Sequence, residues 1–249
     1  MIHSVGPLIL ESILASPNVI AVVWAGIPGQ ESGNALVDVL YGSTSPSGKL
    51  PYTIAQSASD YGTSVINGDD SYPEGLFIDY RRFDKNNITP RYEFGFGLSY
   101  TTFAYSGLTI SSLSTAAGST TLAPGGPKGL YDVLATVTAT ITNNGTVTGA
   151  EVAQLYIGLP SSAPSSPPKQ LRGFSKVSLD AGAKATVSFP LRRKDLSFWD
   201  SAAKKWVLPS GQFKVWVGAS SRDLRLSGTL GSGSGSGSDP EPEPECPDE

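Results

Sequence analysis

The feature that most constrains the fold is a series of short strand signals, separated by turn residues, that begins near Phe103. Regular spacing of such signals favours an antiparallel β-sandwich. The expected strands cover residues 108–110, 131–142, 150–158, 169–179, 183–191, 205–208 and 211–218. In the second strand, one face is predicted to carry Val133, Ala135, Val137, Ala139 and Ile141. The following Asn143-Asn144-Gly145 predicts a hairpin turn.

The first hundred residues have a different rhythm, in which helix and strand signals alternate. Helices are expected over residues 8–15 and 34–41, and buried strands over residues 19–24 and 49–54. This alternation indicates an α/β sandwich. Residues 55–102 are irregular, polar and aromatic, and we expect this long excursion to wrap another surface or to build a site.

The stretch WAGIPGQESGNALVDVLYG, residues 24–42, places a glycine-rich loop before a helix. Such loops often cradle phosphate, but this one lacks both the GxGxxG spacing and a P-loop lysine, which disfavours nucleotide binding. Ser32 or Asn34 is expected to cap the helix, and Gly42 to end it. Its apolar face is predicted to carry Leu36, Val37 and Leu40.

The last residues, 231–249, read as a Gly/Ser linker followed by an acidic, proline-rich tail, and we expect them to be an engineered addition. Six of the 22 acidic side chains lie there, which leaves 18 basic and 16 acidic side chains elsewhere. The single cysteine, Cys246, is a candidate conjugation handle or an incidental part of a tag. No basic run or long apolar run is present, so neither a nucleic acid nor a membrane is an expected partner. Residues 1–4 open as if a longer protein had been truncated.

Four motifs carry a family resemblance. They are ESGNALVDVLYG (residues 31–42), PSGKLP (46–51), EGLFIDYRRFD (74–84) and PRYEFGFGLSYT (90–101). Together and in this order, they resemble the C-terminal part of family 3 glycoside hydrolases, and of the fungal β-glucosidases in particular. The resemblance covers residues 2–230.

The resemblance implies an architecture of a TIM-like barrel, an α/β sandwich and a terminal fibronectin type III-like domain. The fold class expected here is therefore α/β plus all-β. Residues 1–102 would form the second half of the α/β sandwich, with long wrapping loops. Residues 103–230 would form the fibronectin type III-like β-sandwich, and residues 231–249 the flexible tail. The barrel is absent from this sequence.

The resemblance also places the chemistry elsewhere. Retaining glycosidases use two carboxyl groups about 5 Å apart. In the family the nucleophile is an Asp on the barrel, and the acid/base is a Glu upstream of a His-Ser-x-Gly-Pro element, here residues 3–7. No catalytic role therefore falls on this chain, which is expected to be an inactive scaffold without a cofactor. Its expected partner is the missing N-terminal barrel portion. Oligosaccharide would bind only the complete enzyme, whose parent protein is expected to be secreted.

Several residues remain candidates for a supporting role. Gln30 and Glu31 either support the active site from behind, or Glu31 simply favours the positive end of a helix dipole. His3, the only histidine, is a base, a ligand or a structural residue. No metal-ligand spacing is present, so no metal site is expected.

The charged run that contains Asp79, Tyr80 and Arg81 is either a hydrolytic carboxylate site or a network that fastens the long excursion to its neighbours. The resemblance favours the network. Aromatic residues nearby are expected to pack at the domain junction rather than to stack on sugars. They are Tyr92, Phe94, Phe96 and Tyr100.

Two N-glycosylation acceptor patterns occur, at Asn87 and at Asn144, and Pro90 is expected to lower the use of the first. Two alternative functions stay open at this stage. One is a binding or adhesion module, or a conjugation reagent, based on the terminal β-sandwich. The other keeps the family and changes the sugar, to a β-xylosidase.

Overall fold

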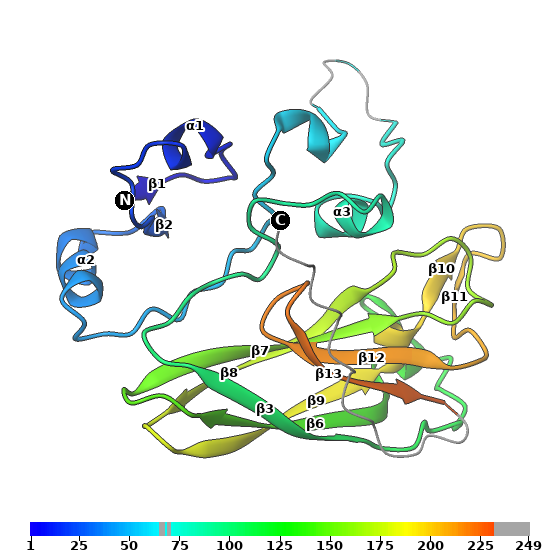
Figure 1. Cartoon of the computed structure of the whole chain (residues 1–249). Helices are drawn as coiled ribbons and strands as arrows, with labels where there is room; N and C mark the ends of the chain where they lie inside the picture. The colour runs from blue at the N-terminus through cyan, green and yellow to red at the C-terminus, as the bar shows by residue number, and fades with distance from the viewer. Residues whose placement is uncertain (65–67, 69–70, 232–249) are drawn as a thin grey trace, which may run out of the picture.

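The computed structural model describes residues 1–64, 68 and 71–231, so Cys246 and the acidic tail lie outside the described residues. Figure 1 shows two parts. A large β-sandwich is built from the C-terminal strands, and a looser group of short helices and strands lies above it. The predicted combination of an α/β part with an all-β part is confirmed.

The sandwich consists of a four-stranded sheet in the order β13-β12-β7-β8 and a three-stranded sheet in the order β3-β6-β9. The first sheet contains β7 (Gly149–Gly158), β8 (Gln170–Leu179), β12 (Phe213–Gly218) and β13 (Leu224–Leu230). The second contains β3 (Phe103–Ile110), β6 (Val133–Asn143) and β9 (Lys184–Arg192). Two small pairs, β4 (Leu122–Ala123) with β5 (Gly126–Pro127) and β10 (Phe198–Asp200) with β11 (Lys205–Val207), and the 3-10 turns η2 (Lys128–Tyr131) and η3 (Arg193–Leu196) complete it.

The core of the sandwich follows from alternation along its strands. On β6, the side chains of Ala135, Val137, Ala139 and Ile141 are all buried between the sheets. Val133 is 52% exposed, contrary to the prediction. The register against β9 shifts between residues 133 and 135, and this irregularity turns the first side chain away from the core.

The predicted hairpin at Asn143-Asn144-Gly145 is wrong. β6 pairs with β3 and β9, whereas β7 pairs with β8 and β12, so the turn crosses from one sheet to the other. Asn143 is fully buried at this crossing. Its amide donates to the carbonyls of Val147 and Leu179, and its Oδ1 accepts from Thr101 Oγ1 and the Gly145 amide.

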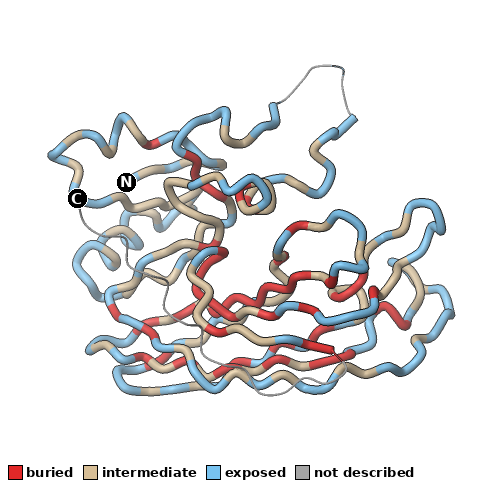
Figure 2. The backbone as a smooth tube through the Cα atoms, turned by 45° about the vertical axis from the view of Figure 1, so that its right-hand side comes forward, coloured by how far each residue is buried: buried red, intermediate tan, exposed pale blue. Residues whose placement is uncertain are grey.

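The upper part contains a two-stranded parallel sheet, β1 (Ile2–His3) with β2 (Trp24–Gly26), and short helices. The helices are α1 (Glu11–Leu14), α2 (Ser32–Leu40), α3 (Tyr80–Lys85) and the 3-10 turn η1 (Ala58–Tyr61). Burial is sparse here, as Figure 2 shows, and Leu10 is the only buried residue among the first fifty. Such a surface predicts low local stability.

Of the two strands predicted in the N-terminal part, one is displaced and the other is not formed. The strand expected over residues 19–24 is reduced to β2, because its neighbour β1 is two residues long and offers little ladder to pair with. Residues 49–54 form no strand. Instead they exchange isolated backbone hydrogen bonds with the loop over residues 91–96, including one bridge between Ile54 and Tyr92.

Helix α2 also differs from its prediction at its start. Glu31 occupies the N-cap, and no side chain makes a capping hydrogen bond there. Asn34 instead donates to the Glu31 carboxylate at 2.6 Å. Gly42 follows the helix with a positive φ of 81°, as a C-terminal stop requires. On the predicted apolar face, Val37 and Leu40 are exposed, since no element of the described chain packs over them.

Candidate functional site

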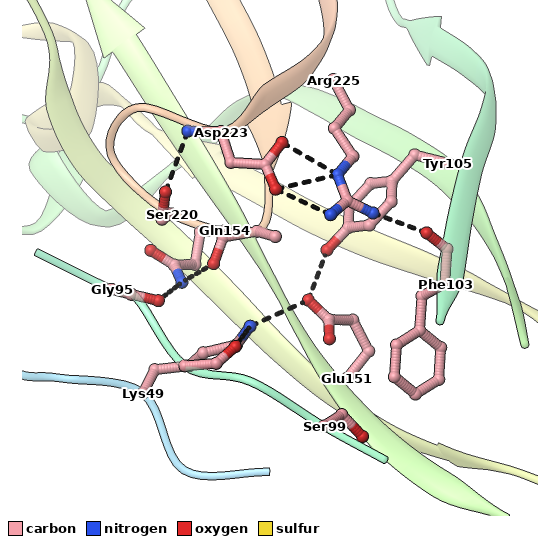
Figure 3. Close-up of polar contacts among 12 residues, drawn as sticks. Lys49, Gly95, Ser99, Phe103, Tyr105, Glu151, Gln154, Ser220, Asp223 and Arg225 are labelled. Carbon is pink, nitrogen blue, oxygen red and sulfur yellow. Dashed lines mark hydrogen bonds and ion pairs between the residues drawn. The ribbon is translucent and has the colours of Figure 1, made fainter. Parts of the chain in front are cut away.

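A group of buried polar side chains lies where the upper part meets strand β7 (Figure 3). Lys49 comes from the upper part and places its Nζ 3.2 Å from the carboxylate of Glu151 on β7. The Tyr105 hydroxyl donates to the same carboxylate at 2.8 Å. Burial, followed by the nearby Glu151 charge, raises the pKa of Tyr105, so its phenol stays a neutral donor.

Gln154 joins three segments at this junction. Its Nε2 donates to the carbonyls of Gly95 and Ala219, and its Oε1 accepts from the Tyr156 hydroxyl at 2.6 Å. The amide is buried, and every one of these bonds is between protein groups. A buried amide that is satisfied in this way fixes the relative position of the segments.

Asp79 is a structural residue at the start of α3. Its φ of 53° is unusual for a residue with a side chain. The carboxylate accepts from the Thr53 amide, from Thr53 Oγ1 at 2.5 Å and from the Tyr80 amide at 2.5 Å. These bonds hold the backbone in that conformation and leave the carboxylate engaged with the chain itself.

Tyr80 and Arg81 lie at the contact between α3 and the sandwich. The Tyr80 ring packs on Phe94 with centroids 4.7 Å apart, and its hydroxyl accepts from the Leu171 amide at 3.0 Å. Burial raises the pKa of Tyr80. The Arg81 guanidinium lies 5.8 Å from the Tyr80 ring centroid. Of the three residues, Tyr80 makes the direct contact with the sandwich, while Asp79 and Arg81 lie beside it on the α3 side.

Asp84 completes this network from the far end of α3. Its carboxylate is buried and lies 2.7 Å from Lys169 Nζ and 3.4 Å from a terminal nitrogen of Arg222. Arg222 also donates to the carbonyl of Ile88. The interpretation of the charged run as a fastening network therefore agrees with these contacts.

Gln30 and Glu31 lie in a different place. They line a shallow hollow of about 460 Å³ with Pro28 and Ser32, at the start of α2. A neighbouring hollow of about 500 Å³ is lined by His3 and other residues beyond the carboxyl ends of β1 and β2. Ligands often bind beyond the carboxyl ends of parallel strands. Across the described residues, no hydrogen bond or ion pair connects Gln30 or Glu31 to the α3 network.

Of the four aromatic residues that were expected to pack at the domain junction, three pack on other rings and one is half-exposed. Phe94 packs on Tyr80, and Tyr92 stacks on Phe96 with centroids 5.2 Å apart. Tyr100 is half-exposed and donates to the carbonyl of Val39 at 2.8 Å. Three of these four rings therefore pack against other aromatic rings, which is consistent with packing at the domain junction.

Three residues with central contacts at the junction are harder to recognise from the sequence than these motifs. Lys49, Glu151 and Gln154 were not singled out from the sequence, although each has a central role at the junction. A usable signal was present, because Glu151 and Gln154 are polar residues within the otherwise apolar strand β7. Their partners Tyr105 and Gly95 are 46 and 59 residues away along the chain, which sequence spacing does not reveal.

Over residues 1–64, 68 and 71–231, no cluster of three or more His, Cys, Asp or Glu residues could hold a metal ion. No helix within those ranges has the length and apolar character needed to cross a bilayer.

Comparisons with known proteins place this architecture. Residues 1–100 match the glycosyl hydrolase family 3 C-terminal domain, and residues 151–221 match the fibronectin type III-like domain. The molecule is thus a family 3 C-terminal domain joined to a fibronectin type III-like domain. The chain belongs to glycosyl hydrolase family 3, of which it carries the C-terminal domain, and it is similar to part of the β-glucosidases of that family.

Individual relatives support this assignment. The chain is 64% identical to a probable β-glucosidase L from Aspergillus terreus, over 92% of this chain and 32% of the relative. The solved β-glucosidase D2-BGL from Chaetomella raphigera is 70% identical, with a TM-score of 0.90 over 92% of this chain and 32% of that one. A β-D-glucoside glucohydrolase from Trichoderma reesei is 64% identical, with a TM-score of 0.88 and the same coverage. The chain therefore spans about a third of the length of these relatives.

Proposed function

We propose that this chain is the non-catalytic C-terminal scaffold of a retaining β-glucosidase. The complete enzyme would hydrolyse terminal β-D-glucosyl residues of cellobiose and short oligosaccharides without a cofactor. The names of the relatives, which are β-glucosidases, support a glucoside in preference to a xyloside.

The observation that carries this proposal is the state of the junction carboxylates. Asp79 caps α3, Asp84 is paired with two cations, and Glu151 is paired with Lys49. Hydrolysis with retention needs two carboxyl groups that face a substrate together. Each of these three acids instead faces its own protein partners, which supports a structural use for them.

The exposed apolar surface of the upper part supports a missing partner. Ile20 is 96% exposed, Tyr41 86% and Ile27 72%, and Val37 and Leu40 on α2 are also exposed. Large exposed apolar side chains that gather on one part of a protein usually mark an interface. We infer that the N-terminal barrel portion of the complete enzyme covers them, since the chain spans only about a third of the length of its relatives.

The first expected result concerns activity. The purified chain should cleave a nitrophenyl β-glucoside at least about 10⁴-fold more slowly than the complete enzyme, since acid/base catalysis alone contributes roughly 10²–10⁴-fold and the nucleophile would be absent as well. Nitrophenol release measures this directly. A matched sample of the complete enzyme is the positive control, and addition of the separately produced barrel portion should restore turnover. Clear turnover by the chain alone would refute the proposal.

We also propose that the parent enzyme is secreted and that Asn144 carries an N-glycan. Asn144 and Thr146 are both exposed on the turn between β6 and β7. Asn87 is exposed as well, but the amide of the following Ile88 is bonded to Phe83, and Pro90 follows the acceptor pattern.

The second expected result follows from this difference. When a eukaryotic host secretes the chain, Asn144 should be occupied in most molecules, and Asn87 at least several-fold less often. Enzymatic deglycosylation in ¹⁸O water, followed by peptide mass spectrometry, measures the occupancy of each site. Thr146→Ala is the matched control, because it removes the acceptor pattern and keeps Asn144. An unmodified Asn144 in the secreted parent chain would overturn the assignment.

A further inference from the structure

Two arginines lie beside Tyr80 where α3 contacts the sandwich. Arg81 follows Tyr80 on α3 and places its guanidinium carbon 5.8 Å from the Tyr80 ring centroid. Arg172 lies on β8, next to Leu171, whose amide donates to the Tyr80 hydroxyl at 3.0 Å. The two cations therefore come from opposite sides of one interface, and the charges of both act on the Tyr80 hydroxyl.

Both guanidinium groups have unused hydrogen-bonding capacity. The Nε atoms of Arg81 and Arg172 are buried and have no hydrogen-bond partner. Among the described residues, no hydrogen bond or ion pair reaches the Arg81 guanidinium, and Arg172 makes a single side-chain bond, to Gln170 at 3.0 Å. Enclosed N–H donors that lack an acceptor are costly, and they are uncommon in native proteins.

The nearby carboxylates already have other partners, so the positive charge of the two arginines is not balanced. Asp84, at the end of the same helix, is paired with Lys169 and Arg222. Burial lowers the pKa of Arg172, the charge of Arg81 lowers it further, and Asp195 acts in the opposite direction. Asp195 accepts from the Arg192 amide at 2.8 Å, so it is already bonded within its own turn.

We propose that Arg81 and Arg172 together form a carboxylate-binding site, occupied in the complete enzyme by an acidic side chain of the N-terminal portion. This occupant rests on the function proposed above. A guanidinium presents its donors in a planar fork that matches the two oxygens of a carboxylate. A carboxylate would satisfy donors from both arginines and neutralise one of the two charges, whereas a sugar hydroxyl would leave both charges uncompensated. The site therefore gives the interface a specific polar anchor beside its apolar area.

The site itself is tested with acetate as the probe. Thermal unfolding of the full chain is followed at constant ionic strength while acetate replaces chloride. Acetate should raise Tm by about 3 °C at concentrations well above its Kd, because binding to the folded state stabilises it. Arg81→Gln and Arg172→Gln should each abolish the shift. Lys214→Gln, which removes an exposed cation from β12, is the matched control and should keep it. An equal shift in all four proteins overturns the site.

The occupant is tested by association with the barrel portion of the parent enzyme, measured by titration calorimetry. Arg81→Gln should weaken this association about 10-fold, and Lys214→Gln should leave it unchanged. Lost acetate binding with unchanged association would refute the acidic side chain as the occupant. If the unsubstituted chain does not associate with the barrel portion, the proposed function is refuted, and the proposed occupant with it. The acetate series still decides whether the site exists. Arg172→Gln repeats the test on the sandwich side, in case Arg81→Gln disturbs the packing on Tyr80.

Discussion

Replacing Asp84 with alanine is expected to lower the free energy of unfolding by about 3–5 kcal/mol, since removal of one member of a buried ion pair leaves the Lys169 ammonium largely buried and unpaired. Lys169 and Arg222 both contact this carboxylate, and they reach it from the sandwich. The loss should appear as a lower urea midpoint, with helix α3 released from the sheet. Urea unfolding followed by circular dichroism measures it.

Two variants sharpen this experiment. Asp132→Ala removes an exposed carboxylate and should change the stability by less than about 0.5 kcal/mol. Asp84→Ala combined with Lys169→Met should recover part of the loss, because the stranded ammonium is gone. A midpoint for Asp84→Ala that matches the parent chain would mean that the buried contacts of Asp84 are not stabilising.

Replacing Asn143 with alanine should cost about 2–3 kcal/mol, because the buried Leu179 carbonyl and Thr101 hydroxyl lose their partner together, as does the part-buried Val147 carbonyl. The crossing between the two sheets depends on these bonds. Asn144→Ala is the control, and all proteins compared are produced without glycans. Because Asn144 is exposed, this substitution should change the free energy of unfolding by less than about 0.5 kcal/mol. Equal urea midpoints for the two variants would show that the crossing does not depend on the Asn143 amide.

The Asn143-Asn144-Gly145 turn also shows what could not be predicted from the sequence. Asn143-Asn144-Gly145 has the composition of a hairpin turn, and composition cannot report which sheet the next strand joins. Strand pairing is decided by the packing of two apolar faces, so the same turn residues serve here as a crossing between sheets. Likewise, the apolar run over residues 19–24 reads as a strand, and most of it pairs with no other strand among the residues that the structure describes.

The candidate site divides in the same way. The motif around Asp79, Tyr80 and Arg81 was recognisable from the sequence, and the family resemblance favoured a fastening network over a hydrolytic site. Its partners were not recognisable, because Leu171 and Lys169 are about ninety residues away along the chain. The junction residues Lys49 and Gln154 were missed for the same reason. A long-range hydrogen bond leaves no periodic signal in either of the segments that it joins.

The sequence alone determined the succession of structures: an α/β part, a long excursion and a β-sandwich whose alternating strands specify their buried face. It also determined the family, through four motifs in order. Only the tertiary structure decided which strands are neighbours, which carboxylates are neutralised and which cations at the junction remain without an acid. The physical reason is that periodicity and turn chemistry act over a few residues, whereas burial and charge pairing depend on segments that meet only after the chain has folded.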